Sequence, residues 1–433
     1  MSTLVVTGGK VLGPDLSIET RDVVVDTTAG TIERVAEPGE YAGSDELDAS
    51  GNLVIPGLVN AHTHVAMTLL RGHADDKPLD AWLQEDIWPV EAELRAEDVE
   101  AGAALGVAEM IRSGTTAFAD MYFFMPAVAE IVETSGIRAR LGHGCITVGK
   151  DEKTAHEDFE QGLEFARAYA DTAGGRIQTM FTPHSLTTVD EAFYREYVEI
   201  ARDAEVPIHF HANETENEVD PLVDEYGKRP LAYADDLGLL ADDSFLAHGV
   251  YVDETEMELL AERETAVIHC PASNMKLASG MAPVQEMLDA GVPVGLGTDG
   301  AASNNDLDMF DEMRDAAMLG KLAADDASAV AAPTVVEMAT AGSARALGFD
   351  SGRIEEGANA DLAVIDLDAE HLTPQHDLVS HLVYAARGSD VRHTICDGKV
   401  LMRDRVLRTL DLEAVMQGAT DRAKSLFTRA DMQ

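Results

Sequence analysis

Two histidines, His62 and His64, stand one residue apart in the stretch 57–72, which reads GLVNAHTHVAMTLLRG. An apolar run, LVIPGLV, precedes them, and residues i and i+2 of a strand point to the same face. Two imidazoles that converge at the end of a strand can share one metal ion. The alternative is a pair of solvated histidines in a loop, and this pattern alone leaves both interpretations open.

A third histidine and a carboxylate follow two later apolar runs. His211 closes the run in VPIHFHANE, and Asp299 follows the run in VPVGLGTDG. A mononuclear catalytic site needs three or four nitrogen or oxygen ligands and one open position for water. Each residue alone has a structural alternative, since an Asp before Gly is typical of a turn. Taken together with the first pair, they predict one divalent metal ion per chain, and zinc is the ion we expect from this ligand set.

Two further groups could move protons beside such an ion. Glu214 comes three residues after His211, an offset that could place its carboxylate near the ion without making it a ligand. The alternative is a solvated Glu at the start of a helix. His248, in LAHGVYV, is a second candidate base, with a buried structural histidine as its alternative.

The elements that must position these residues are eight apolar, strand-like runs separated by helical stretches. Near-continuous apolar strands that alternate with helices are typical of buried parallel strands, so we predict an α/β fold with a (β/α)₈ TIM-type barrel. The runs lie at 52–64, 115–122, 138–148, 176–185, 206–214, 244–252, 265–273 and 292–300. Polar residues at their ends would share the barrel's carboxyl-terminal face, where barrel enzymes carry their sites. These residues are His62, His64, Asp120, His143, His184, His211, His248, His269 and Asp299.

The two ends of the chain differ from the barrel segment. Residues 1–56 and 357–405 contain short alternating strands with turn signals, and a helical pattern starts at about residue 410. We therefore predict one small β-sandwich module assembled from both ends. The predicted divisions are 1–56 for its first part, 57–356 for the metal-dependent barrel, and 357–433 for its second part with a closing helix.

Composition limits the classes of protein that fit. The net charge of −47 is spread along the chain, which argues against nucleic-acid binding, and no apolar run is long enough for a membrane span. The beginning of the chain lacks the pattern of a signal peptide, so we expect a cytoplasmic protein. Such a charge needs screening, which indicates a salt-rich, halophilic cytoplasm. The three cysteines form no CxxC pair. We also expect a homo-oligomer.

The motifs resemble those of the amidohydrolase superfamily, and in particular its methylthioadenosine/S-adenosylhomocysteine deaminase branch. The similarity extends over nearly the whole chain. It rests on GLVNAHTH, WPVEAEL, TPHSL, IHFHANET, LAHGVYV, CPASNMKLASG, GLGTDGAASNNDLDMF and EEGANADLAVIDLD. The HxH and TDG motifs are superfamily-wide, whereas TDGAASNNDLDMF and CPASNMKLASG are more specific to the nucleoside deaminases.

The resemblance implies a role for each matching residue. His62, His64, His211 and Asp299 would bind one metal ion, since Pro183 and His184 stand where two-metal members carry a bridging Lys or Glu. Glu214 would protonate the purine ring, while His248 and Asp299 would handle the attacking water. Glu91 would contact the ribose hydroxyls, and His184 would make a further substrate contact.

The implied reaction is hydrolytic deamination of 5′-substituted adenosines, which gives the inosine analogue and ammonia. Alternatives are the same machinery acting on 5′-deoxyadenosine, adenosine or guanine, on a ring halide or an amide, and, in another class, a non-catalytic metal-stabilised barrel. A base-only substrate would offer Glu91 no ribose to hold. One position departs from the pattern, since His143 stands where an Arg would bind the carboxylate of S-adenosylhomocysteine. Lys150 or Lys153 could reach that carboxylate instead, and we expect the methylthio substrate to be used at least as well.

Overall fold

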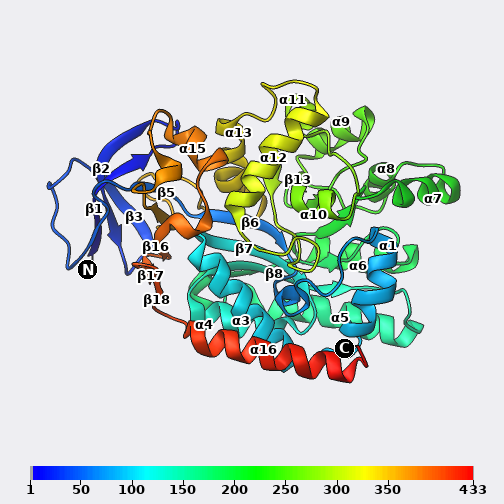
Figure 1. Cartoon of the computed structure of the whole chain (residues 1–433). Coiled ribbons are helices and arrows are strands. Elements are labelled where there is room, and N and C mark those ends of the chain that lie inside the picture. The colour runs from blue at the N-terminus through cyan, green and yellow to red at the C-terminus, as the bar shows by residue number, and fades with distance from the viewer. Residues whose placement is uncertain (1–2, 433) are drawn as a thin grey trace.

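Two parallel sheets form the centre of the molecule, and the computed structural model describes residues 3–432 (Figure 1). Their strands are buried along their whole lengths, apart from one residue of β9, as the near-continuous apolar runs require. The first sheet contains β6 (Leu58–Thr63), β7 (Thr115–Tyr122), β8 (Arg138–Cys145), β9 (Ile177–Thr179) and β10 (Thr182–Pro183). The second contains β11 (His209–Ala212), β12 (Phe245–His248), β13 (Ala266–His269) and β14 (Val294–Leu296).

Backbone contacts join the two sheets at both edges. A parallel bridge pairs Phe181 with Ile208 on one side, and the Asp299 amide donates to the His62 carbonyl at 3.0 Å on the other. A Cβ at Gly297 would lie 2.7 Å from the His62 nitrogen, so a glycine permits the approach of β14 to β6. The predicted α/β class with parallel strands is confirmed, and each of the eight predicted runs contains a strand of these sheets, with the fourth divided into β9 and β10.

Helices surround the sheets, and several begin at an aspartate that caps free backbone amides. Asp151 accepts from the Thr154 amide at 2.8 Å at the start of α5, and Asp253 and Glu256 form a capping box at α9. The helices that precede β11 in the chain are α1 (Leu79–Trp82), α2 (Trp88–Glu91), α3 (Ala96–Arg112), α4 (Met125–Ser135), α5 (Glu152–Tyr169) and α6 (Glu191–Asp203). Those that follow are α7 (Glu216–Tyr226), α8 (Pro230–Asp236), α9 (Glu254–Arg263), α10 (Pro271–Lys276), α11 (Val284–Asp289), α12 (Met309–Ala323), α13 (Ala332–Glu337), α14 (Ser343–Ala346), α15 (Leu378–Tyr384) and α16 (Leu412–Arg429).

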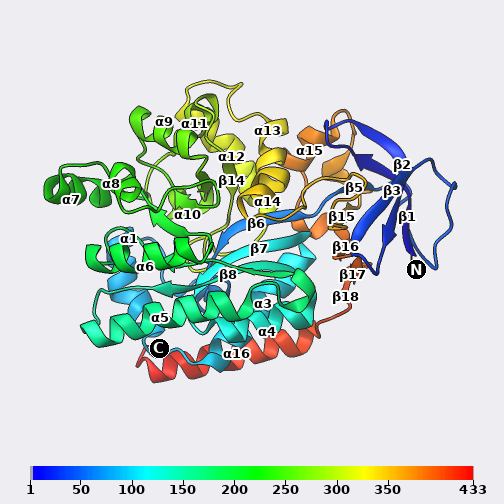
Figure 2. The same cartoon turned by 180° about the vertical axis from the view of Figure 1, so that it is seen from behind.

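A nine-stranded sheet contains strands from both ends of the chain (Figure 2). The contact between the two ends is the antiparallel pair of β15 and β5, in which Leu362 lies opposite Pro56. Its strands are β1 (Thr3–Leu12), β2 (Ile18–Asp26), β3 (Thr31–Ala36), β4 (Asp45–Asp48), β5 (Leu53–Pro56), β15 (Leu362–Ile365), β16 (Val391–Cys396), β17 (Lys399–Arg403) and β18 (Val406–Leu407). The pairing gives one continuous sheet, and the two-layer sandwich stays a prediction.

Ion pairs with a buried partner attach the outer elements to the barrel segment. Arg138 in β8 is 5% exposed and donates to Asp361 at 2.7 Å, beside β15 of the nine-stranded sheet. The helix expected from about residue 410 is α16, which lies along α3 (Figure 1) and pairs Arg429 with the buried Asp98. Because a buried charge is costly without its partner, both pairs fix the position of the element that they join.

No helix among residues 3–432 combines the length and apolar character that a membrane crossing requires.

Candidate active site

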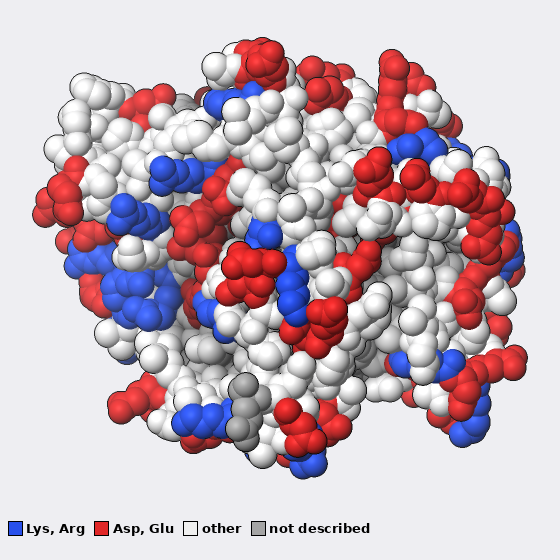
Figure 3. All heavy atoms as spheres, turned by 45° about the vertical axis from the view of Figure 1, so that its right-hand side comes forward, with Lys and Arg blue, Asp and Glu red and all other residues white. Residues whose placement is uncertain are grey.

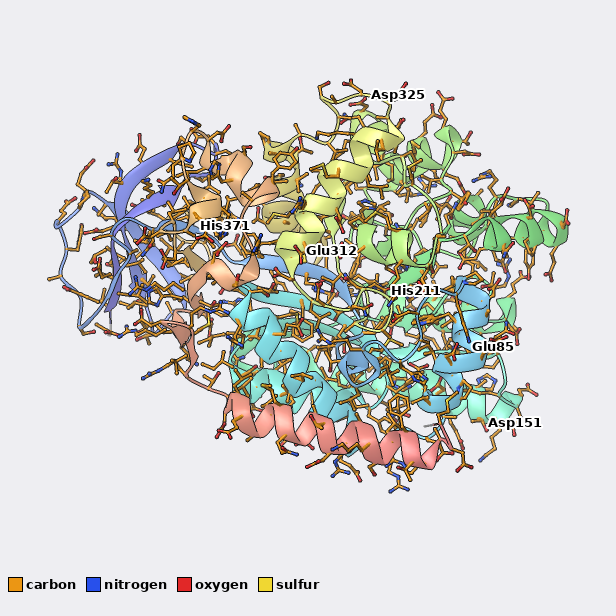
Figure 4. The ribbon with its side chains drawn as sticks, in the orientation of Figure 1. Glu85, Asp151, His211, Glu312, Asp325 and His371 are labelled. Atoms are coloured by element: carbon orange, nitrogen blue, oxygen red, sulfur yellow. The ribbon has the colours of Figure 1, made fainter. Side chains whose placement is uncertain are left out.

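The strand-end histidines and Asp299 come together in the interior, where Figure 4 labels His211. One ligand atom from each of His62, His211, His248 and Asp299 lies within 4.8 Å of the others. His64 joins them, because its Nε2 lies 3.2 Å from Asp299 Oδ1, which is also 3.3 Å from His62 Nε2. The structure thus brings together the four predicted ligands and the predicted base His248.

Hydrogen bonds at Nδ1 set the orientation of three of these imidazoles. The Nδ1 atom of His64 lies 2.6 Å from the Met121 carbonyl, and that of His211 lies 2.7 Å from the His184 carbonyl. His248 Nδ1 lies 3.0 Å from the side-chain oxygen of Asn274. A carbonyl oxygen only accepts, so each Nδ1 carries the proton. Each Nε2 is then left with its lone pair for a ligand, an arrangement typical of metal-binding histidines.

His62 is oriented by a second histidine, which the sequence analysis did not single out. His209 Nδ1 donates to the Phe245 carbonyl at 2.9 Å, so its Nε2 accepts from His62 Nδ1, also at 2.9 Å. His62 Nε2 is buried and has no hydrogen-bond partner within residues 3–432. A buried nitrogen without a partner is costly, and a metal ion would satisfy it. The signal for His209 was in the sequence, since His209 and His211 repeat the HxH spacing of His62 and His64.

The electrostatics of the cluster favour bound cations. Burial lowers the pKa of His62 to about 4 and holds that of His211 well below its usual range, so both are neutral. Burial would lower the pKa of His64 as well, but the hydrogen bond and charge of Asp299 raise it to about 9. A proton and a metal ion compete for the same lone pair, so a position that attracts the first also attracts the second.

Asp299 is held by two hydroxyl groups on the side away from the histidines. Ser273 and Ser303 donate to its Oδ2 at 2.7 and 2.6 Å, which leaves Oδ1 directed at His62 and His64. Sequence analysis missed both serines, although they lie in the quoted motifs CPASNMKLASG and TDGAASNNDLDMF. The donor set of buried imidazole nitrogens and one carboxylate oxygen suits a divalent transition metal.

Glu214 lies beside this cluster. Its Oε2 is 3.5 Å from His248 Nε2, and its side chain is 7% exposed. Burial, with a further contribution from the charge of Asp299, raises the pKa of Glu214 to about 8. A carboxyl group with such a pKa can hold a proton at neutral pH and release it, as a general acid and base must.

A cavity of about 670 Å³ adjoins the cluster and is lined by several of the other predicted substrate residues. Its wall contains Glu91, which accepts from the Tyr122 hydroxyl at 2.7 Å. Burial raises the pKa of Glu91 to about 7. The sequence analysis did not single out Tyr122 or the aromatic lining. Apolar and aromatic lining residues include Leu79, Trp82, Leu83, Trp88, Leu94, Phe123, Phe124 and Val148.

The remaining predicted contacts separate into those that line the cavity and one that does not. His143, Lys150 and His184 line it, together with Asp158, which the sequence analysis missed. Lys153 is not among the lining residues, because its side chain is 84% exposed and pairs with Glu157. Of the two lysines considered for a carboxylate, the fold therefore brings only Lys150 to the cavity.

Comparison with known proteins agrees with this geometry. The model of the amidohydrolase family matches residues 53–401. The chain belongs to the amidohydrolase family. Among family relatives, a protein of Haloarcula marismortui named 5-methylthioadenosine/S-adenosylhomocysteine deaminase is 67% identical over 99% of this chain and 100% of its own. A 5′-deoxyadenosine deaminase of Methanosarcina mazei is 47% identical over 93% of both chains.

A solved structure shares the architecture of this chain. The crystal structure of an adenosine deaminase from Xanthomonas campestris with bound zinc superposes with a TM-score of 0.94 at 39% identity, over 99% of both chains. The close superposition supports a TIM-type barrel for the joined parallel sheets.

Proposed function

We propose that this protein catalyses hydrolytic deamination at C6 of 5′-substituted adenosines, with 5′-methylthioadenosine and S-adenosylhomocysteine as the substrate class. The observation that carries the proposal is the buried carboxyl group of Glu214 beside four histidines and Asp299, at the base of a nucleoside-sized cavity. The names of the most similar relatives point to the same reaction and the same substrates.

The residues of the cluster fit one divalent metal ion per chain, and we propose zinc. His62, His64, His211 and Asp299 would hold it, because their free ligand atoms face one another and the buried His62 Nε2 has no other partner in the described chain. When bound, such an ion lowers the pKa of water towards 7.

The chain's own groups then move protons. His248 and Asp299 orient the attacking water and accept its proton as the water oxygen bonds to C6. Glu214 delivers a proton to the neighbouring ring nitrogen, as its raised pKa allows. A second proton transfer to the amino group lets the C6–N bond break, and the products are ammonia and the inosine analogue.

The cavity wall would hold the nucleoside. We propose that Glu91 accepts from the ribose hydroxyls, oriented by its hydrogen bond from Tyr122. His184 and His143 would make further contacts, and both line the cavity. A carboxylate in this position favours a nucleoside over a free base, which offers no ribose hydroxyl to hold.

A second candidate is 5′-deoxyadenosine, favoured by the 47% identity to the Methanosarcina enzyme of that name. It lacks a 5′ substituent altogether, so it would leave the outer end of the cavity unfilled. Adenosine and guanine are more distant alternatives. A non-catalytic barrel would not account for a buried Glu214 with a raised pKa beside the cluster.

The test is a panel of adenosines that differ at the 5′ position, with adenosine and guanine added, assayed in molar KCl. Ammonia release and the change in purine absorbance report deamination independently. We expect 5′-methylthioadenosine to be among the best substrates and guanine to be inert. Absence of ammonia from every purine, in protein shown to hold its metal, would contradict the proposed function.

We further propose a cellular location and an assembly state for the enzyme. The net charge of −47 and the relatives from halophiles support a salt-rich cytoplasm, and we propose a homo-oligomer without nucleic-acid or membrane partners.

We also propose that the nine-stranded sheet forms a two-layer β-sandwich, with divisions at 1–56, 57–356 and 357–433. A separate apolar cluster that contains Leu4, Val23, Ile32, Leu362 and Ile395 supports a core for this module.

A further inference from the structure

A closed cluster of polar side chains lies in the wall of the cavity, formed by His143, Lys150 and Asp158. Lys150 Nζ lies 2.5 Å from Asp158 Oδ2, and His143 Nε2 lies 2.9 Å from Asp158 Oδ1. The Ile146 amide also donates to Asp158 Oδ2, at 3.1 Å. The side chains of Lys150 and Asp158 are only 21% and 11% exposed. The positive charge of Lys150 is therefore already paired inside the cavity.

Asp158 keeps its negative charge at neutral pH. Burial alone would raise the pKa of Asp158, but its hydrogen bond with His143, followed by the hydrogen bond and charge of Lys150, lowers it. A ligand carboxylate that approached Lys150 would meet this second carboxylate at hydrogen-bond distance from the same nitrogen. Like charges that share one site repel strongly when they are shielded from water.

The orientation of His143 adds to this effect. Its Nε2 faces Asp158, and its Nδ1 is buried without a hydrogen-bond partner among residues 3–432. The Cδ2 edge of the ring lies on the side of α5, 3.9 Å from the position of a Cβ at Gly162. Nδ1 therefore occupies the opposite edge. Because Nε2 is paired with Asp158 and Nδ1 is buried, neither ring nitrogen of His143 is available to bind a carboxylate.

Apolar side chains line the same cavity as the cluster. They include Phe123, Phe124, Ile146 and Val148, and the centroid of the Phe123 ring lies 6.2 Å from that of His143. Phe124 and Val148 are 38% and 48% exposed, although large apolar side chains are usually covered. A thioether tail that contacted these residues would bury apolar surface without the loss of any polar contact.

We propose that this cluster selects 5′ substituents that carry no carboxylate, and that Asp158 is the specificity-determining residue. The inference rests on the proposed function and assigns a preference within its substrate class. 5′-Methylthioadenosine offers only a methyl thioether to this end of the cavity. S-adenosylhomocysteine must bring its carboxylate next to Asp158, which holds the available cation.

The experiment compares kcat/KM for three substrates: 5′-methylthioadenosine, 5′-S-propylthioadenosine and S-adenosylhomocysteine. The propyl analogue separates the length of the tail from its charge. We expect the wild-type enzyme to use both uncharged thioethers better than S-adenosylhomocysteine. Asp158→Asn frees Lys150, so the ratio of S-adenosylhomocysteine to propyl analogue should rise about tenfold, the value of one gained charge-assisted hydrogen bond.

Two further variants assign that gain to the cluster. Lys150→Met combined with Asp158→Asn should abolish it, because no cation remains. Lys153→Met is the matched control, since it removes an exposed lysine outside the cavity and should leave the ratio unchanged. If thermal melting shows that Asp158→Asn does not fold, His143→Arg replaces it in the test. This substitution adds a permanently charged group beside Asp158 and should likewise raise the ratio of S-adenosylhomocysteine to propyl analogue.

The results that overturn the proposal differ from those that overturn the proposed function. Equal use of S-adenosylhomocysteine and the propyl analogue by the wild type would overturn the selection, as would an unchanged ratio in folded Asp158→Asn or, if that variant does not fold, in folded His143→Arg. Loss of activity on the propyl analogue as well would show that length, rather than charge, limits the tail. Failure to deaminate any adenosine would overturn the proposed function instead.

Discussion

The base of the cavity and its tail end, the cluster of His143, Lys150 and Asp158, differ in how their charged groups are paired. At the base, four imidazole nitrogens and one carboxylate oxygen face one another without a full set of partners, and His62 Nε2 has none among residues 3–432. At the tail end, Lys150 and Asp158 pair with each other at 2.5 Å. The first arrangement attracts a cation, whereas the second has already neutralised its charges.

The difference shows how one cavity can combine strong and weak electrostatic fields. Hydrogen bonds to backbone carbonyls orient the imidazoles at the base, as at His64 and His211. The tail end takes Lys150 from a connecting segment and Asp158 from α5, where a change of one residue alters the net charge. We therefore expect changes at the base to abolish turnover and changes at the tail end to alter substrate preference.

The largest expected effect follows His211→Ala. Removal of this imidazole takes away one ligand, and metal content should fall from about one divalent ion per chain to nearly none, with loss of activity. Elemental analysis of protein purified without chelator measures it. His371→Ala, at a histidine bonded to Asp390 outside the cavity, is the control and should retain the ion. Two tightly held ions per wild-type chain would contradict a mononuclear base.

Glu214→Gln should give the next largest effect. The amide keeps the shape but cannot carry a titratable proton, so kcat should fall by roughly 10²- to 10⁴-fold with the metal retained. Steady-state kinetics and metal analysis on the same sample measure both quantities. Glu312→Gln is a suitable control, because Glu312, labelled in Figure 4, is also buried with a raised pKa but is not among the residues that line the cavity. Near-normal turnover by Glu214→Gln would assign the proton transfer to another group.

Glu91→Gln should change how stability depends on pH. Burial raises the pKa of Glu91 from 4.5 to about 7, so the folded state binds this proton more tightly than the unfolded state does. Its stabilising contribution is complete below the unfolded pKa and is lost as the pH rises through about 7. The free energy of unfolding of Glu91→Gln should therefore rise relative to that of the wild type as the pH increases from 4.5 to about 7. Urea unfolding over that range, without substrate, measures the difference, and a constant difference would refute the assignment.

Salt should act on the surface more than on the base. Acidic side chains are spread over the face drawn in Figure 3, and the net charge is −47. Because the Debye length falls to about 3 Å at 1 M salt, molar KCl should raise the unfolding temperature. Metal content should stay unchanged, since the ligands are buried. Equal thermal stability at millimolar and molar KCl would contradict the salt-adapted interpretation.

Much of the site could be predicted from the sequence because strands place residues in a regular way. Alternation put His62 and His64 on one face, and the repeated β/α units predicted that His211, His248 and Asp299 would end strands at the same side. The same local rules predicted the strands at both ends of the chain and the helix α16. Each of these predictions depends only on residues that are close in the sequence.

Only the tertiary structure decided which partners these side chains have. The contact between His62 and His209 joins strands 147 residues apart, and the bond from Arg138 to Asp361 spans 223 residues. Asp158 is one of many acidic residues in a helix, and nothing in its local sequence distinguishes it. Its pairing with Lys150 and His143 arises where α5 packs against β8. Residue types and local periodicity thus predicted the candidate ligand set, whereas protonation states and the proposed tail specificity depend on distances that exist only after the chain has folded.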